Sequence, residues 1–281
     1  MGQLENTIKI TIPEEQLWEN LKISNDFMFA KVMRNPELCK GMLERLLGIT
    51  IDHIEYPEEQ KVIDISKDSK SVRLDVYLKD EKGTVYNIEI QTTNGKNLPE
   101  RSRYYQGMID LNAIEKGADY KRLPNSFVIF ICTFDAFGDG RWQYTFESIC
   151  RENKKLRLND RAYKIFFNTN GTKGRIGKDA KNILKFIENN TTGDDFTEKL
   201  AQEVQKIKEN KDWKVEYMTL LMREREKYQE GVAEGRAYGI IEFALELNYS
   251  DDKILSMLQK KLNIDMEQAR DYLNRYYEEN L

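Results

Sequence analysis

Alternating apolar and polar residues predict a β-strand over residues 72–79. Every second side chain in this stretch is apolar, in the order Val72, Leu74, Val76 and Leu78. A period of two residues is typical of a strand with one buried face. A second strand is expected over residues 84–93, and it places Glu89 and Gln91 on the same face.

The connection between these strands decides whether two of their acidic residues, Asp75 and Glu89, lie together. A three-residue loop over residues 81–83 ends in a glycine, which tolerates the left-handed conformation that this loop requires. The loop pairs Asp80 with Thr84. Counting back along both strands then places Asp75 directly opposite Glu89, with Cβ atoms about 4.5–5.5 Å apart. A two-residue loop, which this sequence fits poorly, would put the two acids on opposite faces of the sheet.

The periodicity of the next segments predicts an α/β core. Residues 24–47 are expected to form two helices separated at Pro36, and a further helix is expected over residues 98–116. The nearly all-apolar stretch 126–134 is typical of a central strand that is covered on both faces. Another strand is expected over residues 162–168.

From about residue 178 onward the apolar spacing is helical. We therefore divide the chain into an α/β domain over residues 1–190 and a helical C-terminal region over residues 191–281, which could serve oligomerisation or partner binding. Three glycines four residues apart share one helix face there, and they allow either close helix contact or a loose hinge: Gly231, Gly235 and Gly239.

The overall charge excludes a general coat of positive charge, because 44 basic residues face 48 acidic ones. A local basic face is still enough for nucleic acid. The three cysteines lie far apart, which argues against a disulfide framework or a zinc site and fits reduced thiols. The longest strongly apolar stretch, 127–132, is too short to cross a bilayer, and no signal peptide is visible, so we expect a cytoplasmic protein without a membrane partner.

One segment concentrates the positive charge. Residues 151–185 hold 11 Lys or Arg against 3 Asp or Glu, a net charge of +8 in a chain whose total is −4. Within it, Lys173 and Arg175 lie in the glycine-rich stretch 171–177, which lacks the ending of a Walker loop. Two interpretations stay open, a phosphate-binding surface and a solvated loop.

The opposed acids suggest a site for a hard divalent cation. Magnesium takes oxygen ligands, keeps several waters and can activate water for phosphodiester hydrolysis. Asp75 and Glu89 would bind the metal, the backbone carbonyl of Ile90 is a further ligand candidate, and Gln91 could orient water or touch the scissile phosphate. The following helix brings phosphate-binding candidates to the end of the Glu89 strand: Arg101, Arg103, Tyr105 and Gln106.

The same residues also allow a plainer interpretation. An antiparallel pair with a solvated polar face has this pattern too, and acidic residues on strand faces are common. Two features favour the metal site: the flanking strand positions are strongly apolar, and basic residues follow on the next helix.

At these residues the sequence resembles a known family. Asp75 followed by Glu89-Ile90-Gln91, within RLDVYLKDEKGTVYNIEIQ, is similar to the D…(D/E)xK signature of PD-(D/E)XK nucleases. More narrowly it resembles the Rpn-like recombination-promoting nucleases, also labelled transposases, which carry E-x-Q where most relatives carry E-x-K. The resemblance extends to SNDFMFAKVM and ERSRYYQGMID, over about residues 20–150.

The resemblance implies a PD-(D/E)XK restriction-endonuclease-like core, with a mixed central sheet flanked by helices. It also implies cleavage of DNA with Mg²⁺ or Mn²⁺ and a link to recombination or phage defence in bacteria. Asp75 and Glu89 match the metal-binding acids, Gln91 matches the usual lysine, and Asp26 matches an acid near the start of the first helix that would complete the site. Glutamine cannot supply positive charge, so a cation could be borrowed from Arg101 or Arg103.

Three functions remain at this stage. The first is a divalent-metal DNA endonuclease. The second is a non-catalytic DNA-binding or assembly protein that retains the fold, and the missing lysine supports it. The third is a protein-interaction module that works through its C-terminal helices. Double-strand cleavage would favour a homodimer, with those helices as the candidate interface.

Overall fold

The computed structural model describes residues 14–56, 62–63, 72–73 and 75–280. Its chain forms two compact units, Met1–Trp213 and Lys214–Leu281. Among the described residues, none of the helices combines the length and the apolar character needed to span a membrane.

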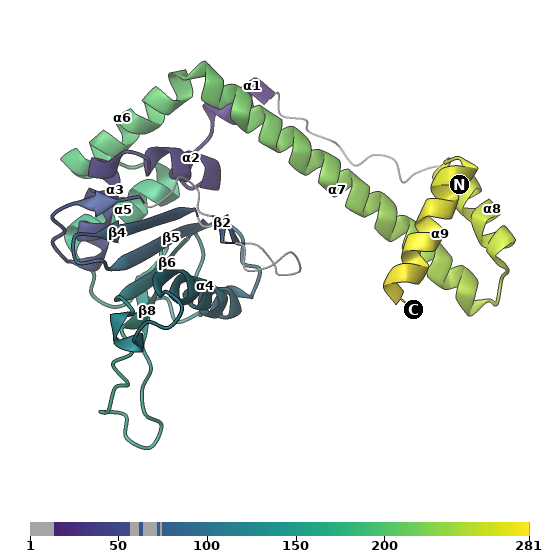
Figure 1. The fold of residues 1–281 in the computed structure, drawn as a ribbon. Coiled ribbons are helices and arrows are strands. Elements are labelled where there is room, and N and C mark those ends of the chain that lie inside the picture. The colour runs from purple at the N-terminus through teal and green to yellow at the C-terminus, as the bar shows by residue number, and fades with distance from the viewer. Residues whose placement is uncertain (1–13, 57–61, 64–71, 74, 281) are drawn as a thin grey trace. The chain divides into compact units, whose positions relative to one another are not determined.

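The first unit is built around a six-stranded mixed sheet with the strand order β1-β4-β5-β6-β8-β7 (Figure 1). The central strands β5, β6 and β8 run parallel to one another, and the strands on either side of them pair antiparallel. The strands are β1 (Ile54–Glu55), β4 (Val76–Asp80), β5 (Val85–Gln91), β6 (Ser126–Cys132), β7 (Gln143–Phe146) and β8 (Ala162–Asn168). Two short strands, β2 (Val62–Ile63) and β3 (Val72–Arg73), pair separately with each other.

Helices cover both faces of this sheet (Figure 1). On one face α4 (Leu98–Ala113) packs Tyr105, Met108 and Ile109 against strand residues that include Phe130. The helices α2 (Asp26–Val32), α3 (Pro36–Leu47), α5 (Lys178–Asn189) and α6 (Asp195–Glu209) pack together, and α2 contacts β5. Two small elements complete the unit, α1 (Glu14–Glu19) and a 3₁₀ turn over Tyr120–Arg122.

Local sequence sets the ends of these helices. The Asn35 side chain accepts hydrogen bonds from the first turn of α3, and Pro36 occupies its first position, where a missing N–H costs nothing. The same helix ends at Gly48, whose φ of 66° is left-handed. The predicted pair of helices over residues 24–47 is therefore confirmed.

The central strands follow from their composition. β6 is apolar along nearly its whole length, because both of its faces are covered. In β5 the buried residues include two polar ones, Asn87 and Glu89. The strands predicted over residues 84–93, 126–134 and 162–168 are confirmed as β5, β6 and β8.

The continuous strand predicted over residues 72–79 is wrong. The chain forms β3 up to Arg73, bends at Asp75 and begins β4 at Val76. β3 pairs with β2, whereas β4 pairs with β5. Alternation reports which side chains are apolar, but it cannot report a change of partner strand. The short edge strand β7 was not predicted.

The second unit consists of helices. It comprises the larger part of α7 (Lys211–Glu246), with α8 (Asp251–Leu262) and α9 (Met266–Asn280), around a core that includes Ile241, Leu258 and Leu273. The three glycines at 231, 235 and 239 lie within the uninterrupted α7. Apart from the backbone of the helix itself, a Cβ atom at any of them would meet no described heavy atom within 4 Å. The sequence placed the domain boundary after residue 190, whereas the compact units divide after Trp213.

Candidate metal centre and active site

The turn between β4 and β5 has the predicted length. Asp80 N–H donates to the Thr84 carbonyl at 3.1 Å, and Gly83 N–H donates to the Asp80 carbonyl at 2.9 Å. Gly83 has a φ of 74°, the left-handed value for which glycine was expected. The paired positions run from Lys79 with Val85 to Val76 with Ile88. One further step places Asp75 opposite Glu89.

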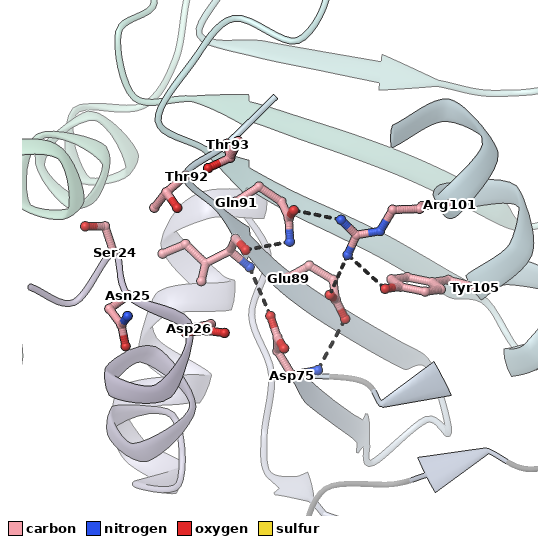
Figure 2. A pocket seen from close by; sticks show the side chains of 11 residues that line it. Ser24, Asn25, Asp26, Asp75, Glu89, Gln91, Thr92, Thr93, Arg101 and Tyr105 are labelled. Carbon is pink, nitrogen blue, oxygen red and sulfur yellow. Dashed lines mark hydrogen bonds and ion pairs between the residues drawn. The ribbon is translucent and has the colours of Figure 1, made fainter. Parts of the chain in front are cut away.

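Asp75 and Glu89 line the same pocket, and backbone hydrogen bonds hold both carboxylates (Figure 2). The Asp75 N–H donates to Glu89 Oε1 at 3.2 Å. In return, Ile90 N–H donates to Asp75 Oδ2 at 3.4 Å. The bend at Asp75 thus turns a backbone donor toward a carboxylate, and the two acids are held on one side of the sheet.

Burial makes the charged form of Glu89 costly. Its exposed fraction is 2 %, and this loss of hydration, followed by the negative charge of Asp75, raises the pKa of Glu89 to about 8. The hydrogen bond from Asp75 N–H, the Asn87 amide and the Arg101 charge act in the opposite direction. A cation bound between the two carboxylates would favour their ionised forms, so this environment suits a metal ion.

Asn87 is a site residue that the sequence analysis did not find. Its Nδ2 donates to Glu89 Oε1 at 3.2 Å, and its side chain is fully buried. Among the described atoms, Asn87 Oδ1 has no hydrogen-bond partner. The signal in the sequence was a polar residue two positions before Glu89, on the same face of the strand. We attribute to Asn87 the orientation of the Glu89 carboxylate.

Arg101 brings positive charge next to Gln91 and Glu89. Its guanidinium donates to Gln91 Oε1 at 2.7 Å and to the Tyr105 hydroxyl at 2.9 Å. Its Nη2 lies 3.6 Å from Glu89 Oε2. Gln91 also donates to the Ile90 carbonyl at 2.7 Å. Gln91 therefore connects a carbonyl that could bind a metal with the arginine from α4.

A pocket of about 400 Å³ contains these groups. It lies between the start of α2, the end of β5 and α4 (Figure 2), and its lining residues are Ser24, Asn25, Asp26, Asp75, Glu89, Ile90, Gln91, Thr92, Thr93, Arg101 and Tyr105. Asp26 lines it from the first turn of α2, where its Oδ1 accepts from Phe27 N–H at 2.8 Å. In the described part of the chain, no group of three or more His, Cys, Asp or Glu is arranged to hold a metal. The candidate ligands that come together are thus two carboxylates and the Ile90 carbonyl.

The other predicted site residues lie outside this pocket. Gln106 is buried and donates to Asp110 and to Ser126, so it supports α4 against β6 instead of facing a ligand. Arg103 is exposed on α4 and does not line the pocket. Lys173 and Arg175 are exposed in the loop after β8.

Fold and site together define the class. The mixed sheet carries Glu89 on β5, Asp75 lies directly before the adjacent antiparallel strand β4, and the helix that follows returns an arginine to their pocket. This is the arrangement of a PD-(D/E)XK protein. The family model described as PD-(D/E)XK nuclease family transposase matches residues 23–234, well over half of the chain, and the chain belongs to this family. No curated protein and no solved structure matches it.

Family membership confirms the expected fold and supports a nuclease-like function. PD-(D/E)XK nucleases generally use divalent metal ions, and a nuclease acts on nucleic acid. The matched region contains every residue of the pocket.

Proposed function

We propose that this protein is a divalent-metal-dependent endonuclease that hydrolyses phosphodiester bonds in DNA. The observation that carries the proposal is the pair of half-buried Asp75 and buried Glu89, held by backbone hydrogen bonds in one pocket with the guanidinium of Arg101. Two carboxylates forced together need a cation, and a pocket lined by oxygen atoms suits Mg²⁺ or Mn²⁺.

The donor set fits such an ion. Asp75, Glu89 and the carbonyl of Ile90 would hold it, and the bound ion would supply activation of water and charge for the leaving oxygen. The side-chain amide of Asn87 and the backbone N–H of Asp75 both donate to Glu89 Oε1. Neither of these two donors binds Glu89 Oε2. The side chains of Thr92 and Thr93 line the pocket and offer hydroxyl groups to a phosphate.

We assign to Arg101 the positive charge that lysine supplies in most relatives. Gln91 holds this guanidinium at 2.7 Å and Tyr105 holds it at 2.9 Å, so it is positioned before substrate arrives. Arg101→Ala is expected to lower the cleavage rate by about 10²–10³-fold, the usual loss for a positioned charge at the reacting centre. Arg101→Lys should recover part of it, because the charge returns without the bidentate geometry. Equal rates for wild type and Arg101→Ala would contradict this assignment.

The decisive assay is nicking of supercoiled plasmid by purified protein with Mg²⁺ or Mn²⁺. Asp75→Ala and Glu89→Gln should each abolish nicking. Glu115→Gln is the matched control, because Glu115 is exposed after α4 and makes the same change of charge away from the pocket. Nicking that survives in both pocket variants would refute the proposal.

A second candidate function follows from one residue. Gln91 stands where most PD-(D/E)XK nucleases have lysine, which favours a DNA-binding protein that retains the fold without cutting. Tight DNA binding without nicking, in wild type and variants alike, would support this alternative.

We also infer a setting for the activity from the family. A role in recombination or phage defence in the bacterial cytoplasm fits a nuclease of this kind.

One pocket cuts one strand, so double-strand cleavage needs two copies, and we propose that the unit Lys214–Leu281 joins them. Sedimentation equilibrium of the full chain tests the dimer, and a purely monomeric protein that still makes double-strand cuts would contradict it.

A further inference from the structure

Strand β8 divides the basic segment 151–185 into two parts. Residues 151–161 precede β8 and form an arm that projects from one end of the sheet (Figure 1), whereas residues 171–185 follow its other end. The seven residues of β8 separate the two parts by about 20 Å at roughly 3.3 Å per residue. Only the second part lies at the carboxyl ends of the parallel strands, where the pocket is.

A row of polar residues directly after the parallel strands, here called the polar ledge, connects the pocket with that second part. It comprises Thr92 and Thr93 after β5, Thr133 after β6 and Asn170 after β8. Gln91, Cys132 and Asn168 are aligned across β5, β6 and β8, so the three strands end at one level. Thr92 and Thr93, which follow β5, line the pocket and are exposed.

Hydrogen bonds hold the next residues of the ledge side by side. Thr133 N–H donates to the Gln91 carbonyl at 3.0 Å, and Asn170 Nδ2 donates to the Thr133 carbonyl at 3.0 Å. Adjacent strands lie about 4.8 Å apart, so the ledge spans about 10 Å from β5 to β8.

The basic loop at the far end of this ledge is firmly held. Lys173 N–H donates to the Gly140 carbonyl at 2.8 Å, and Trp142 N–H donates to the Lys173 carbonyl at 3.2 Å. Gly171 lies so close to Trp142 that a Cβ atom there would be 2.5 Å from the Trp142 Cα. The loop therefore presents its side chains from a fixed backbone, which lowers the entropy lost on binding.

The charges at this end are predominantly positive. Asp139 faces both Arg141 at 2.7 Å and Lys173 at 3.3 Å. Residues 135–141 and 171–185 together hold six Lys or Arg against three Asp, so this end keeps a net positive charge. Arg175 and Lys178 are exposed and form no ion pair with any described residue. A polyanion is the partner that such a surface complements.

We propose that a DNA strand bound in the pocket continues across the ends of β5, β6 and β8, where Lys173 and Arg175 hold its phosphates. This inference rests on the proposed function and adds the path of the substrate. At a rise of about 3.4 Å per nucleotide in one strand, the 10 Å ledge corresponds to about three nucleotides beyond the scissile phosphate. Thr133 and Asn170 line the path as neutral polar groups.

The test compares two double variants that remove the same charge. Lys173→Ala with Arg175→Ala changes the loop at the ledge, and Lys154→Ala with Lys155→Ala changes the arm at the opposite end of the sheet. All four side chains are exposed. Binding of a DNA duplex is measured in EDTA over a series of salt concentrations, so no cleavage occurs. The loop variant should lower the slope of log affinity against log salt by about 2, since each phosphate contact contributes about 0.9. The arm variant should leave the slope unchanged.

Arg175→Gln provides a milder change at a residue without an ion pair in the described chain, and it should lower the slope by about 1. Equal slopes for the loop and arm variants, or a larger effect of the arm, would overturn the path. Absence of DNA binding by the wild type would overturn it too. Loss of nicking in every protein, with the slopes as expected, would refute only the proposed enzymatic function.

Discussion

Replacing Glu89 by glutamine is expected to stabilise the metal-free protein while it removes metal binding. Glutamine keeps the shape of the side chain, and its amide oxygen can accept the hydrogen bonds that Asp75 N–H and Asn87 Nδ2 give to Glu89 Oε1. It removes the negative charge that is buried beside Asp75. Stability and function should therefore respond to this change in opposite directions.

The pH dependence follows from the direction of the pKa of Glu89. The unfolded chain releases this proton near pH 4.5, whereas burial and the Asp75 charge let the folded protein keep it up to about pH 8. The stability that Glu89 contributes is therefore fully present below pH 4.5 and is lost as the pH rises to about 8. Each pH unit in this window costs the wild type at most about 1.4 kcal/mol. By about pH 7 we expect Glu89→Gln to be more stable by about 1–3 kcal/mol.

The measurement is denaturant unfolding in EDTA at about pH 5, 7 and 9, with Glu115→Gln as the control. Wild type and Glu89→Gln should nearly coincide at the lowest pH and separate as the pH rises. Adding Mg²⁺ at about 100 times its Kd should stabilise the wild type by about 2.7 kcal/mol and leave Glu89→Gln unchanged. If Glu89→Gln is less stable than the wild type at every pH in EDTA, the reasoning about buried Glu89 beside Asp75 is refuted.

Further predictions concern the support of the site. Asn87→Ala removes one of two donors to Glu89 Oε1 and should weaken Mg²⁺ or Mn²⁺ binding by about 10–100-fold in calorimetric titration; unchanged affinity would contradict the positioning role of Asn87. Gly83→Ala imposes the φ of 74° on a residue with a Cβ and should cost about 1–2 kcal/mol in urea unfolding. Gly107→Ala, in α4 where an added Cβ meets nothing within 4 Å, should instead raise stability by up to about 1 kcal/mol. Equal effects of the two glycine changes would contradict the turn geometry.

The hairpin and its acidic pair could be predicted from the sequence, because a loop of a given length allows only one pairing register between the two strands. A glycine at residue 83 selected the three-residue loop, and the alternation of the strands then fixed which residues face each other. The central strands were predictable for a related reason, since an unbroken apolar run such as β6 can only be covered on both faces.

Other features depend on partners that lie far away in the sequence. Asn87 is polar and lies two residues before Glu89 on the same strand, but only the folded sheet reveals that both are buried. Gln106 follows Tyr105 on α4, yet it turns inward to Ser126, a residue 20 positions away. The Arg101 guanidinium was one of two candidates for the missing charge, and helix periodicity alone could not choose between it and Arg103.

The length of the surface turn at residues 81–83 sets the pairing register of β4 and β5, and with it the position of Glu89. The side chain of Lys82 is exposed, so it can be exchanged. The length of the turn cannot change, because one residue more or fewer would slide β5 past β4 and rotate Glu89 to the side now taken by Ile88 and Ile90. Insertion of a single residue into this turn should therefore abolish metal binding in the pocket, whereas substitutions at position 82 should be tolerated.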